Sequence, residues 1–308
     1  MKEKKSDVGL IIFSKKTDQL PIEKINLRIL EEIKKQDLKP KIFYYDHFSV
    51  FFKKNKLEIF YDNNKINPKK FSFFITQYYF LNQEFSNNMF IVNCLNELGI
   101  KVFNSISSAN KAKNKRDTLL KLSMNGLPII PTSINFSGFF LDQHLKRNNN
   151  NKIVVKSNNG SMGYGVSVLD SHISFVSFME FVTNKFQAVD ILIQPFVESN
   201  NEDYRVFVVG NRIVAGMKRR ANGIEFRANV SKGGLGIKFK VSKKMAGIAI
   251  RATKILGLDY AGVDIIKDKK GDLMIVEVNS NPGLKIENAT GINIAGEIIK
   301  HCIKKSKK

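Results

Sequence analysis

The amino-acid sequence predicts an α/β protein, with an open and largely parallel sheet in its first third and antiparallel strands later in the chain. In the first third, β-branched and aromatic runs alternate with segments whose apolar residues have helical spacing. From Tyr204 onward, short apolar runs follow one another across tight turns such as Gly210-Asn211. The chain has 308 residues, which is longer than a domain built on a single hydrophobic core usually is. We therefore expect three packed units, at residues 1–110, 111–192 and 193–308.

The first unit begins with a strand, a helix and a second strand. Residues 8–13 form an apolar run that predicts a buried strand, and Pro21 opens a segment with isoleucines at helical spacing that ends near Lys34. The same patterns predict strands at 41–45, 56–61, 71–75 and 101–103, and a helix at 89–98 that ends at Gly99. This β-α-β rhythm favours a parallel sheet.

The rest of the chain continues with mixed elements. Residues 109–124 predict one basic helix, which Asn125-Gly126 stops, and Pro128 and Pro131 then mark a boundary between units. The later strands are expected at 152–156, 191–197, 205–209, 213–217, 261–267 and 273–279, and the later helices at 173–186, 243–256 and 293–304.

The chain is strongly basic. Lysine and arginine together number 50 against 28 aspartates and glutamates, which gives a formal net charge of +22 at pH 7. This surplus indicates an anionic partner such as nucleic acid, nucleotide phosphates or an acidic peptide, or else a genome bias toward lysines that are simply solvated. Cys94 and Cys302 have neither zinc-ligand nor disulfide-framework spacing, so a reducing cytoplasm is expected. No apolar run approaches the ~20 residues of a membrane-spanning helix, so no membrane partner is expected.

Three polar residues in apolar strands predict a metal site. Glu277 and Asn279 are two residues apart and share one strand face, and the hairpin before them brings Asp264 alongside. Two buried carboxylates repel each other unless a cation lies between them, and oxygen ligands suit a hard ion such as Mg²⁺. The alternative is a pair of acids on an edge strand that face water, against which the flanking valines and isoleucines argue.

A glycine-rich segment follows the strand at 152–156. Backbone N–H groups of residues 158–165 (NNGSMGYG) can bind phosphate oxygens, and Lys156 places an ammonium group beside them. The segment matches neither the P-loop nor the dinucleotide-binding pattern, and alone it is also compatible with a plain hairpin turn.

Arginines gather in a third stretch. Arg219, Arg220 and Arg227 suit bidentate binding of carboxylates or phosphates, and Asp203 and Arg205 precede them. A nucleic-acid face is the alternative, although this stretch lacks the interleaved aromatic residues of an RNA platform.

The order of these motifs resembles the ATP-grasp ligases, and closely the RimK subfamily of α-L-glutamate ligases. The resemblance covers residues 101–304, and its ending ENATGINIA, at 287–295, is especially close. The other matching stretches are QPFV at 194–197, DYR at 203–205, FRAN at 226–229, AGVD at 261–264 and VEVNSNPG at 276–283. The resemblance implies an ATP-grasp fold with an N-terminal pre-ATP-grasp domain, a central lid subdomain and a C-terminal subdomain with the metal site.

The resemblance also implies roles for individual residues. For the phosphates of ATP, it implies contacts from Lys115, from Lys156 and from a lid at 161–165 that includes Ser161, Met162 and Gly163. For the adenine, it implies contacts from Gln194, Pro195, Phe196 and Val197. For the ribose, it implies a contact from Asp203. Arg227 and Asn229 would hold the phosphates or an acyl phosphate, and Arg205, Arg220 and Arg227 would be catalytic, the first two facing the acyl substrate. Asp264, Glu277 and Asn279 would bind the metals. Asn114 and Gln77 depart from the family pattern, which more often has Asp and Arg there.

The activity implied is an ATP-dependent carboxylate–amine ligase that works through an acyl phosphate, with two Mg²⁺ or Mn²⁺ ions. The partners implied are an amino acid, glutamate first, and an acidic protein C-terminus, most simply that of a ribosomal protein. A homo-oligomer is among the expected states. The alternatives are a ligase that adds glutamate or a related amino acid to a cofactor or carrier protein, and a basic RNA- or ribosome-binding protein with a vestigial nucleotide site.

Overall fold

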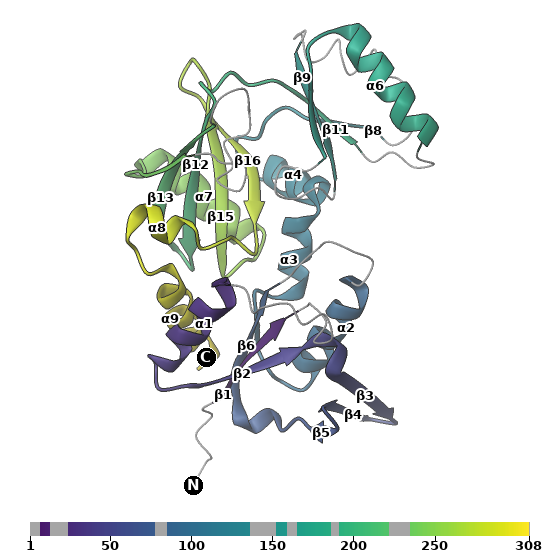
Figure 1. Cartoon of the computed structure of the whole chain (residues 1–308), viewed down its shortest axis with the longest axis vertical. Coiled ribbons are helices and arrows are strands. Elements are labelled where there is room, and N and C mark those ends of the chain that lie inside the picture. The colour runs from purple at the N-terminus through teal and green to yellow at the C-terminus, as the bar shows by residue number, and fades with distance from the viewer. Residues whose placement is uncertain are drawn as a thin grey trace.

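The computed structural model describes residues 7–12, 24–77, 85–135, 152–158, 165–185, 191–221 and 235–307. Its elements form three sheets with their helices along the length of the molecule, and a small additional sheet at one end (Figure 1). Helices and strands alternate in the first part and antiparallel strands dominate later, so the predicted α/β class is confirmed.

The N-terminal unit is built on a four-stranded parallel sheet in the order β2-β1-β6-β7. Its strands are β1 (Asp7–Ile12), β2 (Lys39–Tyr44), β6 (Phe71–Gln77) and β7 (Val102–Phe103). Every residue of β1 is buried, because α1 (Lys24–Lys34) packs against one face of the sheet and α2 (Phe85–Glu97) against the other. A separate antiparallel sheet consists of β3 (Phe48–Lys53), β4 (Lys56–Tyr61) and β5 (Asn64–Lys65), with short 3₁₀ helices at Tyr45–His47 and Pro68–Lys70.

The prediction of one basic helix at 109–124 is wrong in one respect, because two helices occupy this stretch. They are α3 (Ile106–Lys113) and α4 (Lys115–Met124). Asn114 between them is extended, with φ −78° and ψ 107°, and its side chain accepts hydrogen bonds from the backbone N–H groups of Arg116 and Asp117. Asn114 is therefore the N-cap of α4, and it places Lys115 at the start of the second helix.

The central unit is a four-stranded antiparallel sheet in the order β10-β9-β11-β8. Its strands are β8 (Ser133–Asn135), β9 (Ile153–Ser157), β10 (Val166–Leu169) and β11 (Ile191–Pro195). Helix α6 (His172–Lys185) covers one face by burying Phe175 and Met179.

The C-terminal unit is a five-stranded antiparallel sheet in the order β14-β13-β12-β15-β16. Its strands are β12 (Glu202–Val209), β13 (Arg212–Arg220), β14 (Leu235–Lys238), β15 (Tyr260–Lys267) and β16 (Leu273–Asn279). Helix α7 (Lys243–Ile255) packs on one face. The short α8 (Ile286–Thr290) and α9 (Ile294–Ser306) pack on the other, where they share a hydrophobic core with α1 and β1.

Asn104 links the N-terminal and C-terminal units through buried hydrogen bonds. Its Nδ2 donates to the carbonyl oxygens of Tyr260 (2.9 Å) and Ser280 (2.8 Å), and its Oδ1 accepts from the backbone N–H groups of Asp259 (2.6 Å) and Tyr260 (3.2 Å). The residue is 1% exposed. One amide side chain therefore satisfies backbone groups at the start of β15 and just after β16.

We expect Asn104→Ala to lower the free energy of unfolding by about 2–3 kcal/mol, because the truncation leaves buried backbone groups without partners. Urea denaturation followed by circular dichroism measures the loss. Asn96→Ala, at an exposed position of α2, is the matched control and should change stability by less than ~0.5 kcal/mol. Equal stability of the two variants would contradict the role given to Asn104.

None of the helices in the described ranges combines the length and the apolar character that a membrane crossing requires. Cys94 and Cys302 are both buried free thiols.

Candidate active site

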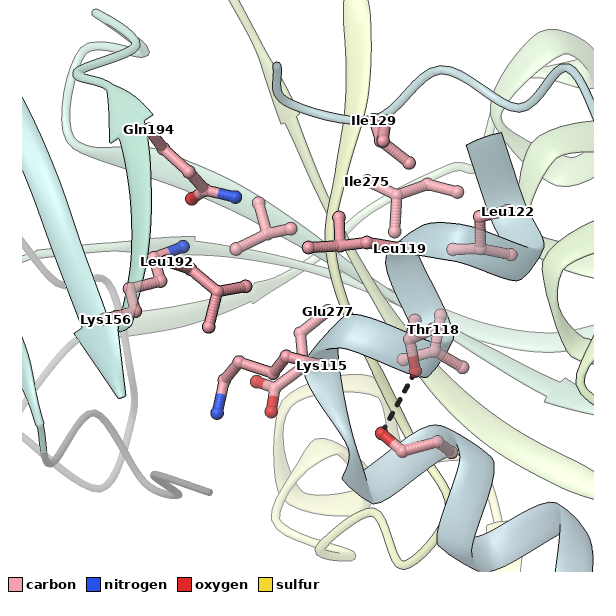
Figure 2. Close-up of a pocket in the computed structure, with 13 residues that line it drawn as sticks. Lys115, Thr118, Leu119, Leu122, Ile129, Lys156, Leu192, Gln194, Ile275 and Glu277 are labelled. Atoms are coloured by element: carbon pink, nitrogen blue, oxygen red, sulfur yellow. Dashed lines mark hydrogen bonds between the residues drawn. The ribbon is translucent and has the colours of Figure 1, made fainter. Parts of the chain in front are cut away.

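A pocket lies where α4, the central sheet and β16 meet (Figure 2). Its walls are mostly aliphatic, and they come from these three elements, from the end of α3 and from the segment after α4. The aliphatic residues are Ala112, Leu119, Leu122, Ile129, Leu192, Ile275, Val276 and Val278, and the polar ones are Lys115, Thr118, Lys156, Gln194 and Glu277. An apolar pocket with a few polar groups suits a small ligand that has a flat apolar part and charged ends.

Two lysines and one carboxylate converge at one side of this pocket. Lys115 is the first residue of α4, Lys156 lies near the end of β9, and Glu277 is on β16. Figure 2 shows the Glu277 carboxylate beside the Lys115 side chain, with Lys156 across from them on the central sheet. The Lys115 ammonium also donates to the carbonyl oxygen of Asn158 at 3.0 Å.

Burial makes these ammonium groups weaker bases than usual. It lowers the pKa of Lys156 to about 8, against the attraction of Glu277 and with added repulsion from Lys115. Burial likewise lowers the pKa values of Lys115 and of a third lysine, Lys113. Lys113 interacts electrostatically with both Lys115 and Glu277. Among the described residues that line the pocket, Glu277 is the only acid. The surplus of positive charge at this pocket therefore suits a polyanionic ligand such as a triphosphate.

Gln194 brings an unused acceptor to the pocket. Its Nε2 donates to Thr132 Oγ1 at 2.8 Å, whereas its Oε1 is buried and has no hydrogen-bond partner among the residues that the structure describes. A ligand amino group at this position would satisfy that oxygen. The following residues Pro195, Phe196 and Val197 are outside the pocket wall, and the backbone N–H of Phe196 donates to Lys152 O at 3.0 Å.

A row of paired charges crosses one face of the C-terminal sheet beside the pocket. Residues that are directly opposite on antiparallel strands share a face, and the register pairs Asp203 with Arg219, Arg205 with Asp264, and Asp264 with Glu277. Arg205 binds Asp264 in bidentate fashion, Nε to Oδ1 at 2.8 Å and Nη2 to Oδ2 at 2.7 Å. We call Asp203, Arg205, Arg219 and Asp264 the charged row.

Arg219 is the centre of the charged row. It makes two bonds to Asp203, at 2.5 and 2.7 Å, and its Nη2 is 3.0 Å from Oδ2 of Asp264. Arg219 is 2% exposed and Asp264 3%. Burial opposes the ionisation of Asp264, but Arg205 and Arg219 outweigh it and hold the pKa of this carboxyl below its usual value. Arg219 and Asp264 are thus buried and ionised, whereas burial raises the pKa of the half-buried Asp203 carboxyl against the attraction of Arg219.

The three predicted metal ligands share the face of the charged row. Asp264 is buried on the inner strand β15, while Glu277 and Asn279 are half-buried on β16, which is an edge strand. Asn279 is opposite Gly262 and donates to its carbonyl oxygen at 3.5 Å. The oxygens of Asp264 bond arginines but keep further lone pairs. The chemistry of this donor set, carboxylates and an amide oxygen, fits a hard divalent cation.

The structure separates Arg219 from Arg220, which the sequence treats alike. Arg220 is at the end of β13 opposite Glu202, its Nε donates to Glu202 Oε1 at 2.9 Å, and it is exposed. Neighbouring strand residues point to opposite faces, so Arg220 points away from Asp264, whereas Arg219 points toward it. From the sequence, Arg219 was only one of several arginines suited to bind anions, and Lys113 was not singled out. The one signal for Arg219 was that it pairs across the hairpin with Asp203.

Several predicted site residues lie outside the described residues: Ser161, Met162, Gly163, Arg227 and Asn229. Asp203 is in the charged row, where its carboxylate accepts two hydrogen bonds from Arg219. Gln77, whose identity departs from the family pattern, is the last residue of β6.

Comparison with known proteins identifies the family. The family model of the RimK-like ATP-grasp domain matches residues 112–302. A protein of Legionella pneumophila strain Corby, described as a probable alpha-L-glutamate ligase, is 38% identical over 221 residues, which are 70% of this chain and 72% of the relative. A probable alpha-L-glutamate ligase of Haemophilus influenzae strain Rd is 40% identical over 203 residues, 65% of this chain and 66% of the relative.

Solved structures share the fold at lower sequence identity. The ATP-grasp ligase PsnB, complexed with a minimal precursor, Mg and ADP, superposes with a TM-score of 0.73 at 14% identity, over 98% of each chain. A RimK domain ATP-grasp protein from Sphaerobacter thermophilus superposes with a TM-score of 0.68 at 14% identity, over 96% of this chain and 98% of that one. The sequence matches and this common fold agree with the resemblance drawn from the motifs. The chain therefore belongs to the RimK-like ATP-grasp family and is an ATP-dependent ligase that forms carbon–nitrogen bonds.

Proposed function

We propose that this ligase adds L-glutamate to the C-terminus of an acidic protein in the cytoplasm, and specifically of a ribosomal protein. The observation that carries the proposal is that an apolar pocket with two lysines lies beside the charged row. Relatives of the chain are described as glutamate ligases, which supports the choice of glutamate. The formal charge of +22 also favours an acceptor tail that becomes more anionic with each added glutamate.

The pocket residues divide the binding of ATP among them. The aliphatic wall from Leu119 to Val278 holds the adenine, and the buried Gln194 Oε1 accepts from its amino group. Lys115 from α4 and Lys156 from β9 hold the phosphates. Asp264, Glu277 and Asn279 would hold Mg²⁺, which when bound neutralises charge that develops on the phosphates.

The reaction then proceeds in two transfers. A substrate carboxylate attacks the γ-phosphorus of ATP, which forms an acyl phosphate and releases ADP, and an amine then attacks the acyl carbon and displaces phosphate. The chain's contribution is positioning and charge. Lys115 and Lys156 orient the phosphates, and Arg205 and Arg219 keep Asp264 ionised and fixed beside them. No side-chain nucleophile is needed.

Incubation with ATP, Mg²⁺, glutamate and a candidate ribosomal protein tests the proposal. Mass spectrometry should show a ladder of glutamate-mass increments on the protein, with longer products at low salt because screening is weaker. ADP release without any modified protein would retain the ligase activity and reject this acceptor in favour of a cofactor or carrier protein. A preparation that releases no ADP with any amino acid would support a vestigial site.

The depressed pKa of Lys156 predicts a pH dependence. Lys156 holds phosphate as an ammonium ion, so kcat/KM for ATP should fall about tenfold per pH unit above pH 8 as the proton is lost. Lys156→Arg keeps its charge throughout this range, and its falling limb should move to higher pH. Lys152→Arg, at an exposed position of the same segment, is the control and should retain the wild-type profile. Identical profiles for all three proteins would show that Lys156 does not contact the phosphates.

A further inference from the structure

We propose that the small β3–β4–β5 sheet of the N-terminal unit binds single-stranded RNA on its outer face. We define this face by Phe51, Lys53, Lys56, Phe60 and Lys65. Phe51 is directly opposite Glu58, Lys53 is opposite Lys56, and Phe60 is opposite Lys65, so these side chains project from one face. Phe51 is 52% exposed.

The opposite face of this sheet is the one that packs against the core of the described N-terminal unit. Ile59 is fully buried there, and Val50, Leu57 and Tyr61 pack against the same hydrophobic core as α2. Alternation then places Phe51, which is exposed, and Phe60, which is half-buried, on the outer face. Solvent-facing positions of an antiparallel sheet are usually polar, so aromatic rings at two of them suggest an external contact.

The charges around these rings favour an anion. Glu58, the acid on the outer face, is an ion-pair partner of both Lys56 and Lys65, so its charge is already matched. Lys53 and Lys54, at the end of the hairpin, are exposed and have no acidic partner among the described residues. The face thus combines two rings with a surplus of ammonium groups.

Single-stranded RNA satisfies both parts of this surface. Each base has a flat π-face that stacks on an aromatic ring, and each nucleotide carries a phosphate for a lysine. Phe51 and Phe60 are diagonal neighbours on adjacent strands, which places them ~7–8 Å apart, within reach of neighbouring bases of an extended strand. An acidic peptide would pair with the lysines but would leave the rings without partners.

The surface is far from the pocket. Figure 1 places β3, β4 and β5 at the end of the molecule opposite the central sheet, so bound RNA would leave the ATP site open. RNA binding would hold the ligase near ribonucleoprotein, whichever acceptor it modifies. The inference is therefore independent of the proposed acceptor, and its test does not require ligation.

Fluorescence anisotropy of the full chain with a labelled 12-nucleotide oligouridine, at several salt concentrations, tests the proposal. Phe51→Ala should weaken binding about tenfold or more at every salt concentration, because one stacked base is lost. The double variant Lys53→Gln, Lys54→Gln should instead reduce the slope of log affinity against log salt by about 1.4, since each lysine contributes ~0.7 for a single strand.

The matched controls are Phe181→Ala, whose ring is 61% exposed on α6, and Lys254→Gln, at an exposed position of α7. Phe181→Ala should bind as the wild type does, and Lys254→Gln should retain the wild-type salt slope. Melting curves and ADP release should be unchanged in Phe51→Ala, since the position is exposed and remote from ATP. Equal RNA affinities of Phe51→Ala and Phe181→Ala would overturn the proposal. So would Phe51-dependent binding of a labelled polyglutamate peptide in place of RNA, which would assign the surface to an acidic polypeptide.

Discussion

Replacement of Glu277 by glutamine should remove most of the ATP turnover and leave the fold intact. Glu277 is half-buried at the side of the pocket where Lys115 and Lys156 converge, and its charge supports the protonated forms of both lysines. It is also one of three oxygen donors proposed for Mg²⁺. Loss of one such charge-stabilising group costs ~10²-fold or more in rate. ADP release with saturating ATP, Mg²⁺ and amino acid measures the effect.

Three comparisons make this expectation specific. Glu198→Gln removes an exposed carboxylate whose partner is Lys269, and its ADP release should equal that of the wild type. The urea denaturation midpoint of Glu277→Gln should be close to that of the wild type, so that lost turnover is not lost folding. Its pH profile should also fall at a lower pH, because Lys156 loses the attraction that raises its pKa. Wild-type turnover in Glu277→Gln would rule out the metal-site assignment.

Replacement of Arg219 by leucine should destabilise the protein by about 3–5 kcal/mol, because two buried carboxylates lose their shared partner. Arg219 bonds both Asp203 and Asp264, and its side chain is 3% exposed. Its neighbour Arg220 is the natural control, since its side chain is 61% exposed and pairs with Glu202 at the surface. Arg220→Leu should cost less than ~1 kcal/mol. Urea denaturation of both variants gives the comparison.

The destabilisation by Arg219→Leu should depend on pH. In the variant, a buried carboxyl group that was bonded to Arg219 lacks the guanidinium. Burial then raises the pKa of this carboxyl above its value in the unfolded chain. A group of this kind destabilises the fold as pH rises from the unfolded pKa toward the folded one. The difference between wild type and variant should therefore shrink as the pH falls toward ~4 and the carboxyl protonates. A difference that is the same at pH 4 and pH 7 would mean that lost packing, and not unpaired charge, causes the effect.

The regular elements were largely predictable because their signals are local. Apolar runs place the strands β1, β9, β11, β15 and β16 to within one or two residues, and glycines after the helices place their ends. The break at Asn114 was also local, since Asn followed by Asp117 is an N-cap pattern, but the continuous basic run hid it. The short strands β10 and β14 could not be read from their own residues, because each exists through pairing with a neighbour.

The site was predictable in composition and less so in contacts. The spacing of Glu277 and Asn279 gave one shared face, and the hairpin register confirms that Asp264 is beside Glu277. The choice between Arg219 and Arg220 depends on which of two alternating positions faces Asp264, and that phase is set by the pairing of β13 with β12. The role of Asn104 depends on residues more than 150 positions away, which no local pattern reveals.

The lowered pKa of Lys156 means that opening or closing of its pocket changes the number of protons bound to the enzyme. Its pocket is walled by separate sheets, with Lys156 and Leu192 on one and Ile275 and Glu277 on the other. Any motion that parts these sheets hydrates the ammonium group and returns its pKa from about 8 toward 10.5. At a pH of ~9, between these two values, opening takes up a proton and closing releases one. Domain movement is thereby visible as buffer-dependent heat in calorimetry, without any label on the protein.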